Sequence, residues 1–323
     1  MNKRNQILAA ILAIQLVVLV VVFWPSSVAS TGPLFAGLSA DQVVRLTIRD
    51  AEGAQITLAR DGAGWVLPDA GDYPVQAASV EALLEKVVDI SGDRVVTQTS
   101  ASHERLKVSD AAFERLITFE LADGTSHKLY LGSAPNYQVL HVRADDQDAV
   151  YLALGLTVYD ARAEATAWVD PVYLSVPTDQ VVAWTLDNPN GTFKFEKDEA
   201  GTWTMEGLAP GETLNQNSVA TAVGRLQSVQ MLRPLGKEEK DEYGLQDPSA
   251  SIVVETQDEE GNENTYILRI GEEQEGDGWV VKSATSPYYV LVTEFTAMDW
   301  VEKARGDFLE APPAPELEAT PES

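Results

Sequence analysis

Histidine is the side chain best suited to acid–base chemistry or metal binding near neutral pH, and this chain of 323 residues has three. They are His103, His127 and His141, and none lies three or four positions from another. They therefore cannot form the paired ligands that one helix face offers to a metal ion. Cysteine is absent, which excludes disulfides, thiolate ligands, cysteine nucleophiles and lipid attachment at a cysteine. We predict that the histidines are surface or strand residues and that no residue binds a metal.

Motifs for nucleophilic catalysis and for phosphate binding are missing from the sequence. It contains no Gly-x-Ser-x-Gly turn, no Walker loop and no Gly-x-Gly-x-x-Gly dinucleotide loop. We therefore predict no catalytic residues, no cofactor-binding residues and no cofactor.

Carboxylates are abundant, and they cluster in the acidic runs 145–148, 238–242 and 258–263. General acid catalysis needs a partly buried carboxyl group with a raised pKa. The runs fall in predicted hairpin tips, so we expect solvated turns. A weak calcium site at 258–264 is the alternative, although that run lacks the Asp-x-Asp-x-Asp-Gly order and the final glutamate of an EF-hand loop.

Other residues have both a chemical and a structural interpretation. Asn190-Gly191-Thr192 matches the glycosylation pattern, but it also fits a tight turn, which we favour. Trp65 and Trp203 could stack on a ligand, yet a large aromatic residue at the same place in two copies of a repeat is more typical of a core anchor. Tyr137 and Tyr288-Tyr289 could line a groove, although strands are generally rich in tyrosine.

Charge excludes one class of partner. Asp and Glu number 50 against 23 Lys and Arg, which gives a formal net charge of -27. Such a surface repels a phosphate backbone, so we predict no nucleic-acid partner. Because 45% of the residues are hydrophobic, the chain can still form a packed core. A halophilic surface would give a similar charge imbalance.

The N-terminal segment predicts a membrane anchor. Residues 7–24 are apolar apart from Gln15, and as a helix they would span roughly 27 Å, close to the thickness of a bilayer core. Lys3 and Arg4 precede this run without any nearby acidic residue, so the positive-inside rule puts the N-terminus in the cytoplasm. We expect a single-pass protein of the cytoplasmic membrane, with residues 1–24 as cytoplasmic tip and transmembrane helix, 25–38 as linker and an extracytoplasmic body.

A cleaved signal peptide is the alternative for this segment. Val28-Ala29-Ser30 offers small residues of the kind that signal peptidase accepts. The apolar run is longer than the usual signal-peptide core of about 7–15 residues, which favours the anchor.

The body of the chain repeats itself at an offset of about 138 positions. The matching pairs are Asp41-Gln42-Val43-Val44 with Asp179-Gln180-Val181-Val182, Gly64-Trp65 with Thr202-Trp203, Ser79-Val80 with Ser218-Val219, and Leu131-Gly132 with Ile270-Gly271. We infer two homologous modules, 39–174 and 177–310, joined at Val176-Pro177-Thr178. Residues 311–323 are acidic and rich in proline, which predicts a disordered tail.

Each module shows strand and helix patterns in the same order. Strands are predicted in the first module around 44–48, 56–58, 65, 117–121, 129–131, 139–142 and 149–152, and in the second around 184–186, 193–195, 203, 252–255, 266–270, 279–282 and 288–292. One helix per module has an apolar stripe, with Val80, Leu83, Leu84, Val87 and Val88 in the first and Val219, Val223 and Leu226 in the second. Ser79 or Gln76 lies near the start of the first helix, and Asn215 or Ser218 could cap the second.

The fold class follows from the lengths of the connections. The order β-β-β-α-β-β-β-β has hairpin-length loops, which require antiparallel pairing. We predict an α+β fold in which each module is a mostly antiparallel sheet with one principal helix.

The sequence resembles the bacterial membrane-anchored family catalogued as domain of unknown function 4340, in two tandem copies. The resemblance rests on the N-terminal anchor, the strand 41–48, Gly64-Trp65, the helix after Tyr73-Pro74-Val75 and, above all, Tyr243-Gly244-Leu245-Gln246-Asp247-Pro248, which is similar to the family's Tyr-Gly-Leu-x-x-Pro signature. In the first module His103 to Asp110 occupies that place and keeps only its acidic entry and spacing. The resemblance implies an envelope protein associated with an ABC-type transport system of the gliding-motility kind, and it brings no catalytic residues with it.

Two functions are therefore weighed. The first is a membrane-anchored, extracytoplasmic binding or scaffold protein without catalytic activity, whose partner is another protein of the cell envelope such as a transporter subunit. The alternative is an envelope hydrolase or a sugar- or peptide-processing enzyme with its site between the modules. A pocket there with two carboxylates, or a histidine beside a serine, would favour the enzyme.

Overall fold

The computed structural model describes residues 12, 14–15, 32–274 and 276–311. Most of the predicted anchor at residues 7–24 and the predicted tail beyond Ala311 lie outside these residues. Among the described residues, no helix combines the length and the apolar character needed to cross a bilayer.

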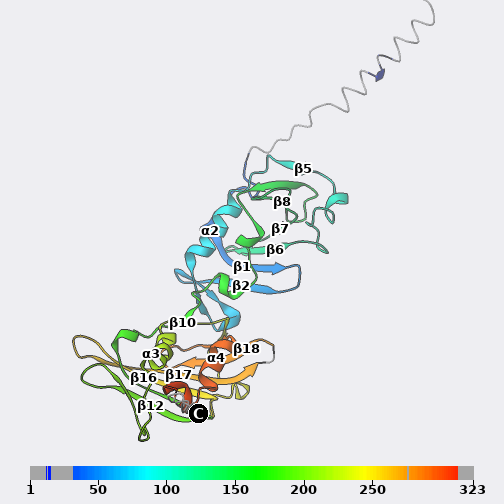
Figure 1. The fold of residues 1–323 in the computed structure, drawn as a ribbon. Helices are drawn as coiled ribbons and strands as arrows, with labels where there is room; N and C mark the ends of the chain where they lie inside the picture. Colours follow the sequence, from blue (N-terminus) through cyan, green and yellow to red (C-terminus); the bar gives the residue numbers. More distant parts are fainter. Residues whose placement is uncertain (1–11, 13, 16–31, 275, 312–323) are drawn as a thin grey trace, which may run out of the picture.

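The first large sheet has nine strands, all antiparallel to their neighbours (Figure 1). Its order is β4-β3-β2-β1-β6-β7-β8-β9-β5. The strands are β1 Val43–Asp50, β2 Gln55–Asp61, β3 Gly64–Leu67, β4 Tyr73–Val75, β5 Val95–Thr97, β6 Arg115–Leu121, β7 Ser126–Leu131, β8 Val139–Ala144 and β9 Val150–Leu154. The helix α2, Ala77–Val88, packs beside it and buries Val80, Leu83, Leu84 and Val87.

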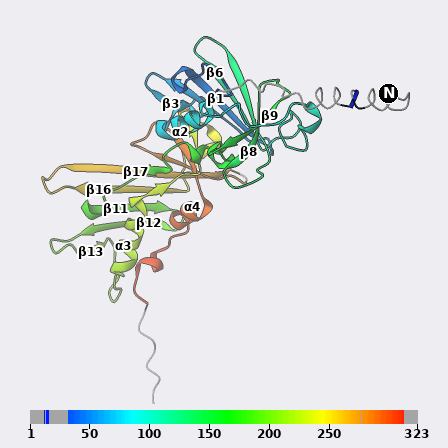
Figure 2. The same cartoon turned by 90° about the horizontal axis from the view of Figure 1, so that it is seen from above.

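The second large sheet has eight strands in the order β13-β12-β11-β16-β17-β18-β19-β15, and its long strands lie side by side in Figure 2. The strands are β11 Val181–Asn188, β12 Gly191–Lys197, β13 Trp203–Met205, β15 Arg233–Gly236, β16 Ala250–Gln257, β17 Glu263–Gln274, β18 Gly278–Ser283 and β19 Tyr289–Val292. Two helices accompany it, α3 Gln216–Gly224 and α4 Glu294–Val301. The Asn215 side chain caps α3 by accepting a hydrogen bond from the Ser218 N–H at 3.0 Å.

Short elements complete the described chain. A two-stranded sheet pairs β10, Val172–Leu174, with β14, Val229–Gln230. The part of the chain that the structure describes also has nine 3-10 helices: η1 Ala40–Gln42, η2 Pro68–Ala70, η3 Ser100–Ser102, η4 Val158–Asp160, η5 Ala165–Ala167, η6 Thr178–Gln180, η7 Arg225–Gln227, η8 Asp241–Tyr243 and η9 Arg305–Phe308. Val176, at the predicted seam, is fully buried, and its N–H donates to Leu226 O at 3.0 Å.

The fold class is α+β and rich in antiparallel sheet, as the hairpin-length loops predict. The predicted element order was incomplete. The strands β4, β5, β10, β14 and β15 were missed because runs of two to four residues are too short to show alternation. The expectation of one principal helix was wrong for the second sheet, since α4 buries Ala297 and Trp300 there. Two buried positions in eight residues make too narrow a stripe to find in a sequence.

In β1, a local irregularity changes which side chains are buried. Alternation predicts Val44, Leu46 and Ile48 on the buried face of β1. Leu46 and Ile48 are fully buried, but Val43 is buried in place of Val44. The register between β1 and β6 shifts between Val43 and Arg45, which is a β-bulge. A bulge adds one residue, so the side chains before it change faces.

Each large sheet packs on both faces. In β7, Leu129 and Leu131 join the main core, whereas Tyr130 belongs to a separate cluster with Leu106 and Val108. In the second sheet, Tyr243 and Leu245 of the signature segment make the corresponding cluster with Val280, Tyr289 and Leu291. Alternate residues of a strand point to opposite faces, so these clusters lie on the faces away from the main core.

Two glycines permit this second layer. A Cβ atom added to Gly271 would lie 1.9 Å from the Tyr243 carbonyl oxygen, and one added to Gly132 would lie 2.2 Å from the Leu106 carbonyl oxygen. Both distances are far below van der Waals contact, so the backbone of each covering segment can approach only a glycine. The pair Leu131-Gly132 and Ile270-Gly271 noticed in the sequence marks these two crossings.

Candidate functional site

The three histidines do not come together as a site. The His103 Nε2 donates to Asp148 O at 2.9 Å, and the His127 Nδ1 donates to Asp145 Oδ2 at 3.0 Å. Both therefore hold the β8–β9 turn. His103 is buried at 9% exposure and lies at the end of η3 rather than in a strand, so its expected surface or strand position was wrong. Within the described residues, no group of three His, Asp or Glu side chains could hold a metal ion.

His141 lies beside Ser133, the pairing that would favour an enzyme. The His141 Nδ1 is 3.1 Å from the Ser133 Oγ and 2.8 Å from the Ser133 carbonyl oxygen. A carbonyl only accepts hydrogen bonds, so Nδ1 carries a proton and cannot also take one from the hydroxyl. The hydroxyl itself donates to Leu106 O at 3.2 Å. This arrangement supports the backbone and lacks the geometry of a nucleophile with its base.

The acidic runs have structural roles in the described chain. The runs 145–148 and 258–263 form hairpin tips, as predicted, but 238–242 lies in the connection from β15 to β16 and includes the start of η8. Asp258 accepts hydrogen bonds from the N–H groups of Glu260 and Asn262 at 2.9 and 2.8 Å. The hydrogen bond from the Asn262 side chain lowers the pKa of Asp258 most, and the bonds from these N–H groups lower it further. The carboxylate therefore organises the turn.

The remaining candidates also take the structural interpretation. Asn190 lies in the β11–β12 turn, and its side-chain amide donates to Glu302 O at 3.0 Å. Trp65 and Trp203 are 2% and 7% exposed, which makes them core anchors. Tyr289 is also buried, whereas Tyr137 is 87% exposed.

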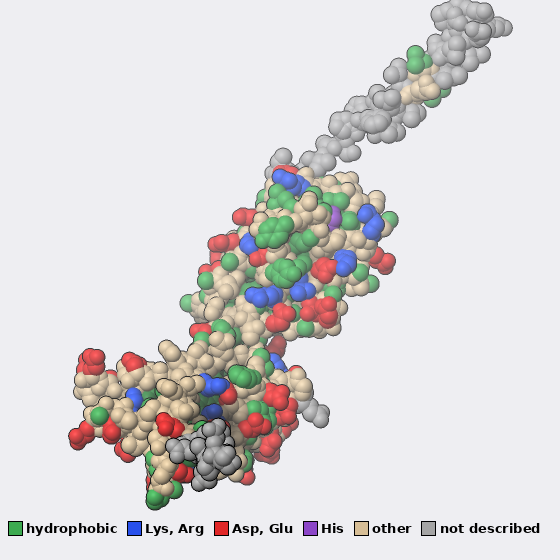
Figure 3. Space-filling model, viewed as in Figure 1, with side chains coloured by type: hydrophobic (Ala, Val, Ile, Leu, Met, Phe, Trp, Pro, Cys, Tyr) green, Lys and Arg blue, Asp and Glu red, His purple; other side chains and the backbone are tan. Residues whose placement is uncertain are grey.

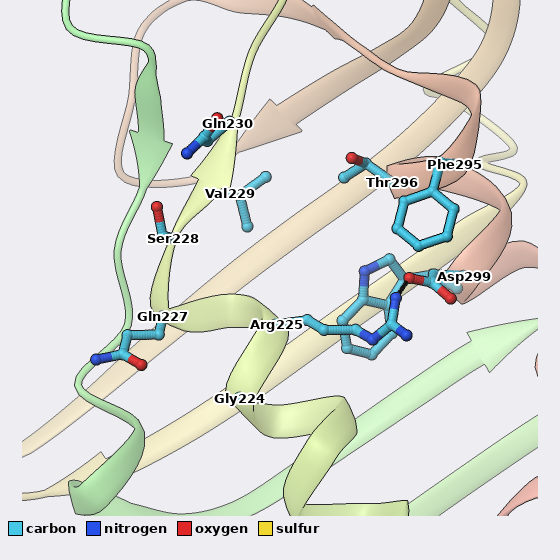
Figure 4. A pocket seen from close by; sticks show the side chains of 10 residues that line it. Gly224, Arg225, Gln227, Ser228, Val229, Gln230, Phe295, Thr296 and Asp299 are labelled. Atoms are coloured by element: carbon cyan, nitrogen blue, oxygen red, sulfur yellow. Dashed lines mark ion pairs between the residues drawn. The ribbon is translucent and has the colours of Figure 1, made fainter.

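A first hollow, the helix pocket, lies between the end of α3, β14 and α4 (Figure 4). Its volume is about 350 Å³. The two charged residues of its lining, Arg225 and Asp299, form an ion pair, and the Arg225 guanidinium lies 5.6 Å from the centre of the Phe295 ring. Because these charges neutralise each other, the pocket offers little to anchor a charged ligand.

A second and larger hollow, the inter-sheet groove, lies between the two large sheets and has a volume of about 500 Å³. It is bounded by β2 and η2 of the first sheet region, by η5 and by the residues around β15 of the second sheet. Its lining includes Gln55, Thr57, Ala70, Ala165, Thr166 and Pro234. Pockets formed where two structural units meet are common places for ligands.

Two carboxylates do line the inter-sheet groove, as the enzyme hypothesis requires. They are Asp69 and Glu164, and both residues are exposed. Neither carboxylate forms a hydrogen bond or an ion pair with the described residues. General acid–base catalysis needs an oriented carboxyl group whose proton affinity burial has changed. The groove therefore has the shape of a binding site without the oriented groups of a catalytic one.

Tyrosines hold the two sheets together next to this groove. The Tyr288 hydroxyl donates to Asp72 O at 2.7 Å, and the rings of Tyr73 and Tyr288 are 4.6 Å apart between centres. The Tyr173 hydroxyl donates to Tyr288 O at 2.7 Å and accepts from the Ser283 N–H at 2.8 Å. We call Tyr73, Tyr173 and Tyr288 the tyrosine contact. It joins β4, β10 and the β18–β19 turn, and so fixes the walls of the groove.

The tyrosine contact predicts a loss of stability in alkali. Burial raises the pKa of Tyr73 to about 12, and the nearby Tyr173 adds to the rise. The neutral hydroxyl is thus favoured in the folded state, so its contribution is complete below pH 10 and is lost as the pH rises through about 12. We expect the urea midpoint to fall between pH 9 and pH 11.5, and to fall less in Tyr73→Phe.

The matched control for this pH effect is Tyr137→Phe, because Tyr137 is 87% exposed. It is expected to follow the unmodified chain at every pH. An equal alkaline decline in Tyr73→Phe and in the unmodified chain would contradict the assignment to Tyr73.

The alternative enzyme hypothesis placed a site between the modules, but sequence reasoning identified neither the lining of the groove nor the tyrosine contact. Tyr288 was noted only as a residue that could line a groove, and Tyr73 only as part of the segment before a helix. Their contact joins positions more than 200 residues apart. The acceptor is the backbone carbonyl of Asp72, which every residue type carries, so the local sequence gives no signal for this contact.

A match to a family model identifies the family of the chain. No curated protein and no solved structure matches the chain. A family model described as Domain of unknown function (DUF4340) matches residues 65–248. The match begins in β3 of the first sheet and ends just before β16 of the second, so it includes parts of both and covers more than half of the chain. The chain therefore belongs to the family described as Domain of unknown function (DUF4340).

Proposed function

We propose that the protein is a membrane-anchored, extracytoplasmic binding protein that contacts another envelope protein and catalyses no reaction. Residues 7–24 would hold it in the cytoplasmic membrane, and the partner we propose is a subunit of an ABC-type transport system. Acidic side chains are spread over the visible face of the described body (Figure 3), which supports a body that stands away from an anionic membrane surface.

The inter-sheet groove is the observation that carries this proposal. It is the more apolar of the two hollows described, it is bounded by both sheets, and its carboxylates are solvated. Largely apolar walls with a small number of polar groups are typical of ligand-binding pockets, and the solvated carboxylates favour binding over catalysis.

We also propose that the body arose by duplication into modules 39–174 and 177–310. The strand orders of the two sheets support this, since the order β3-β2-β1-β6-β7-β8-β9-β5 in the first sheet corresponds strand by strand to β13-β12-β11-β16-β17-β18-β19-β15 in the second. Equivalent cations also lie over the two core tryptophans, Arg60 at 4.8 Å from the Trp65 ring centre and Lys197 at 5.0 Å from that of Trp203.

Crosslinking in native membranes tests the proposed function. We expect the full-length chain to sediment with membranes, to be digested by protease added outside spheroplasts, and to crosslink to a transporter subunit. Recovery of the full-length chain in the cytosol, or alone at every expression level, would contradict the proposal.

A further inference from the structure

We propose that the open edge of β2 in the inter-sheet groove binds an extended peptide segment of the partner protein, by adding it as a strand to the first sheet. This inference rests on the proposed binding function and names the surface and the chemistry of recognition. The expected segment is apolar at alternate positions and carries Lys or Arg.

The open edge follows from the pairing of β2. Its residues 55–59 pair with β1, but pairing with β3 begins only at Ala59. The Asp50 N–H donates to Ala54 O at 3.0 Å, which fixes the alternation of the ladder. Ala54 and Ile56 therefore turn their backbone groups toward β1, and Gln55 and Thr57 turn theirs away. Within the described residues, no strand or side chain pairs with the outward backbone groups of Gln55 and Thr57.

Local sequence keeps this edge open. After Leu67 the chain enters η2 at Pro68 and leaves the sheet, so β3 cannot extend along Thr57 and Gln55. The opposite wall holds Pro234 of β15, which has no N–H to offer. An incoming strand therefore finds its ladder partners on β2, while β15 contributes an apolar wall. Main-chain pairing of this kind gives affinity, and alternate side-chain pockets give specificity.

The charges at the rim indicate the kind of peptide. Asp69 and Glu164 are exposed at the groove, whereas the Arg233 guanidinium is paired with Asp277 at 2.7 Å. The rim is thus negative, which favours a peptide with basic residues. The chain's own residues 312–323 carry Glu316, Glu318 and Glu322 with several prolines, and both features disfavour them as the occupant.

The corresponding strand of the second sheet supplies a matched control. The first residues of β12 also lack a partner in β13, because pairing with β13 begins only at Phe195. Thr192 there is exposed and lines neither the helix pocket nor the inter-sheet groove. Proline at Thr192 and at Thr57 is the same chemical change on two strand edges, of which one faces the groove.

The experiment selects peptides from a displayed library of random dodecapeptides on the purified full chain. The selected peptides are expected to bind at least fivefold more weakly to Thr57→Pro, which lacks one ladder donor. They are expected to lose binding to Thr166→Trp, which fills the groove without changing β2. Thr192→Pro should bind like the unmodified chain. In a selected peptide, every second residue should face the edge of β2. Methylating the amide nitrogens of that set should abolish binding, and methylating those of the other set should leave binding unchanged.

Equal binding to all three variants, or equal effects of methylating either set of amides, would overturn the inference. So would tighter binding to a chain that ends at Ala311, because its own tail would then be the occupant. If one of these results were found while the membrane crosslinks to the transporter subunit remained, the proposed function would still stand. Loss of the crosslinks with peptide binding intact would contradict only the proposed function.

Discussion

Gly271→Ala is expected to destabilise the second sheet by about 3 kcal/mol, the upper end of the usual cost of overpacking. The new methyl group would lie 1.9 Å from the Tyr243 carbonyl oxygen and 3.2 Å from the Leu245 side chain. The clash is with backbone, so no side-chain rotation relieves it. The segment that carries Tyr243 and Leu245 would have to lift from the sheet face. Urea denaturation followed by tryptophan fluorescence measures the loss.

The matched control is Gly224→Ala at the end of α3. A Cβ atom there meets nothing within 4 Å, so the substitution is expected to be neutral or slightly stabilising. Gly132→Ala in the first sheet should behave like Gly271→Ala, because its Cβ would lie 2.2 Å from Leu106 O. If Gly271→Ala proved as stable as Gly224→Ala, the covering segment could not lie where it is described.

Phe308→Ala is expected to lower the free energy of unfolding by about 3–5 kcal/mol, the usual cost of removing a buried aromatic ring. Phe308 follows the last strand and is fully buried. Its ring centre lies 4.7 Å from that of Phe195, 5.7 Å from that of Phe193 and 5.9 Å from that of Trp184. Residues after the family match thus complete the core of the second sheet, and thermal or urea unfolding of the variant measures their contribution.

Phe295→Ala is the control for this second prediction. Phe295 is the same residue type in the same C-terminal region, but it is 73% exposed. Its removal is expected to change stability by less than about 0.5 kcal/mol, as at most surface positions. Similar losses in both variants would mean that the C-terminal segment does not pack through Phe308.

The sequence by itself determined the fold class, most longer strands and the two striped helices. Leu46 and Ile48 follow the two-residue period of a strand, and Leu83 and Leu84 follow the apolar stripe of a helix. Each period predicts which side chains are buried, because residues on one face of an element recur at a fixed spacing along the chain. Trp65 and Trp203 were correctly interpreted as core anchors, because the same large aromatic residue stands at matching places in the two copies of the sequence repeat. The anchor, the function and the absence of catalysis stay predictions.

Only the tertiary structure decided where the chain offers a binding site. The groove exists because β3 departs after Leu67, because Pro234 lies opposite β2, and because Tyr288 reaches Asp72. Each of these relations joins backbone or side-chain groups from separate elements, and apart from proline every residue type carries the same backbone hydrogen-bonding groups. A local pattern of side chains records which face of a strand is buried, but it cannot record which edge of that strand is left without a partner.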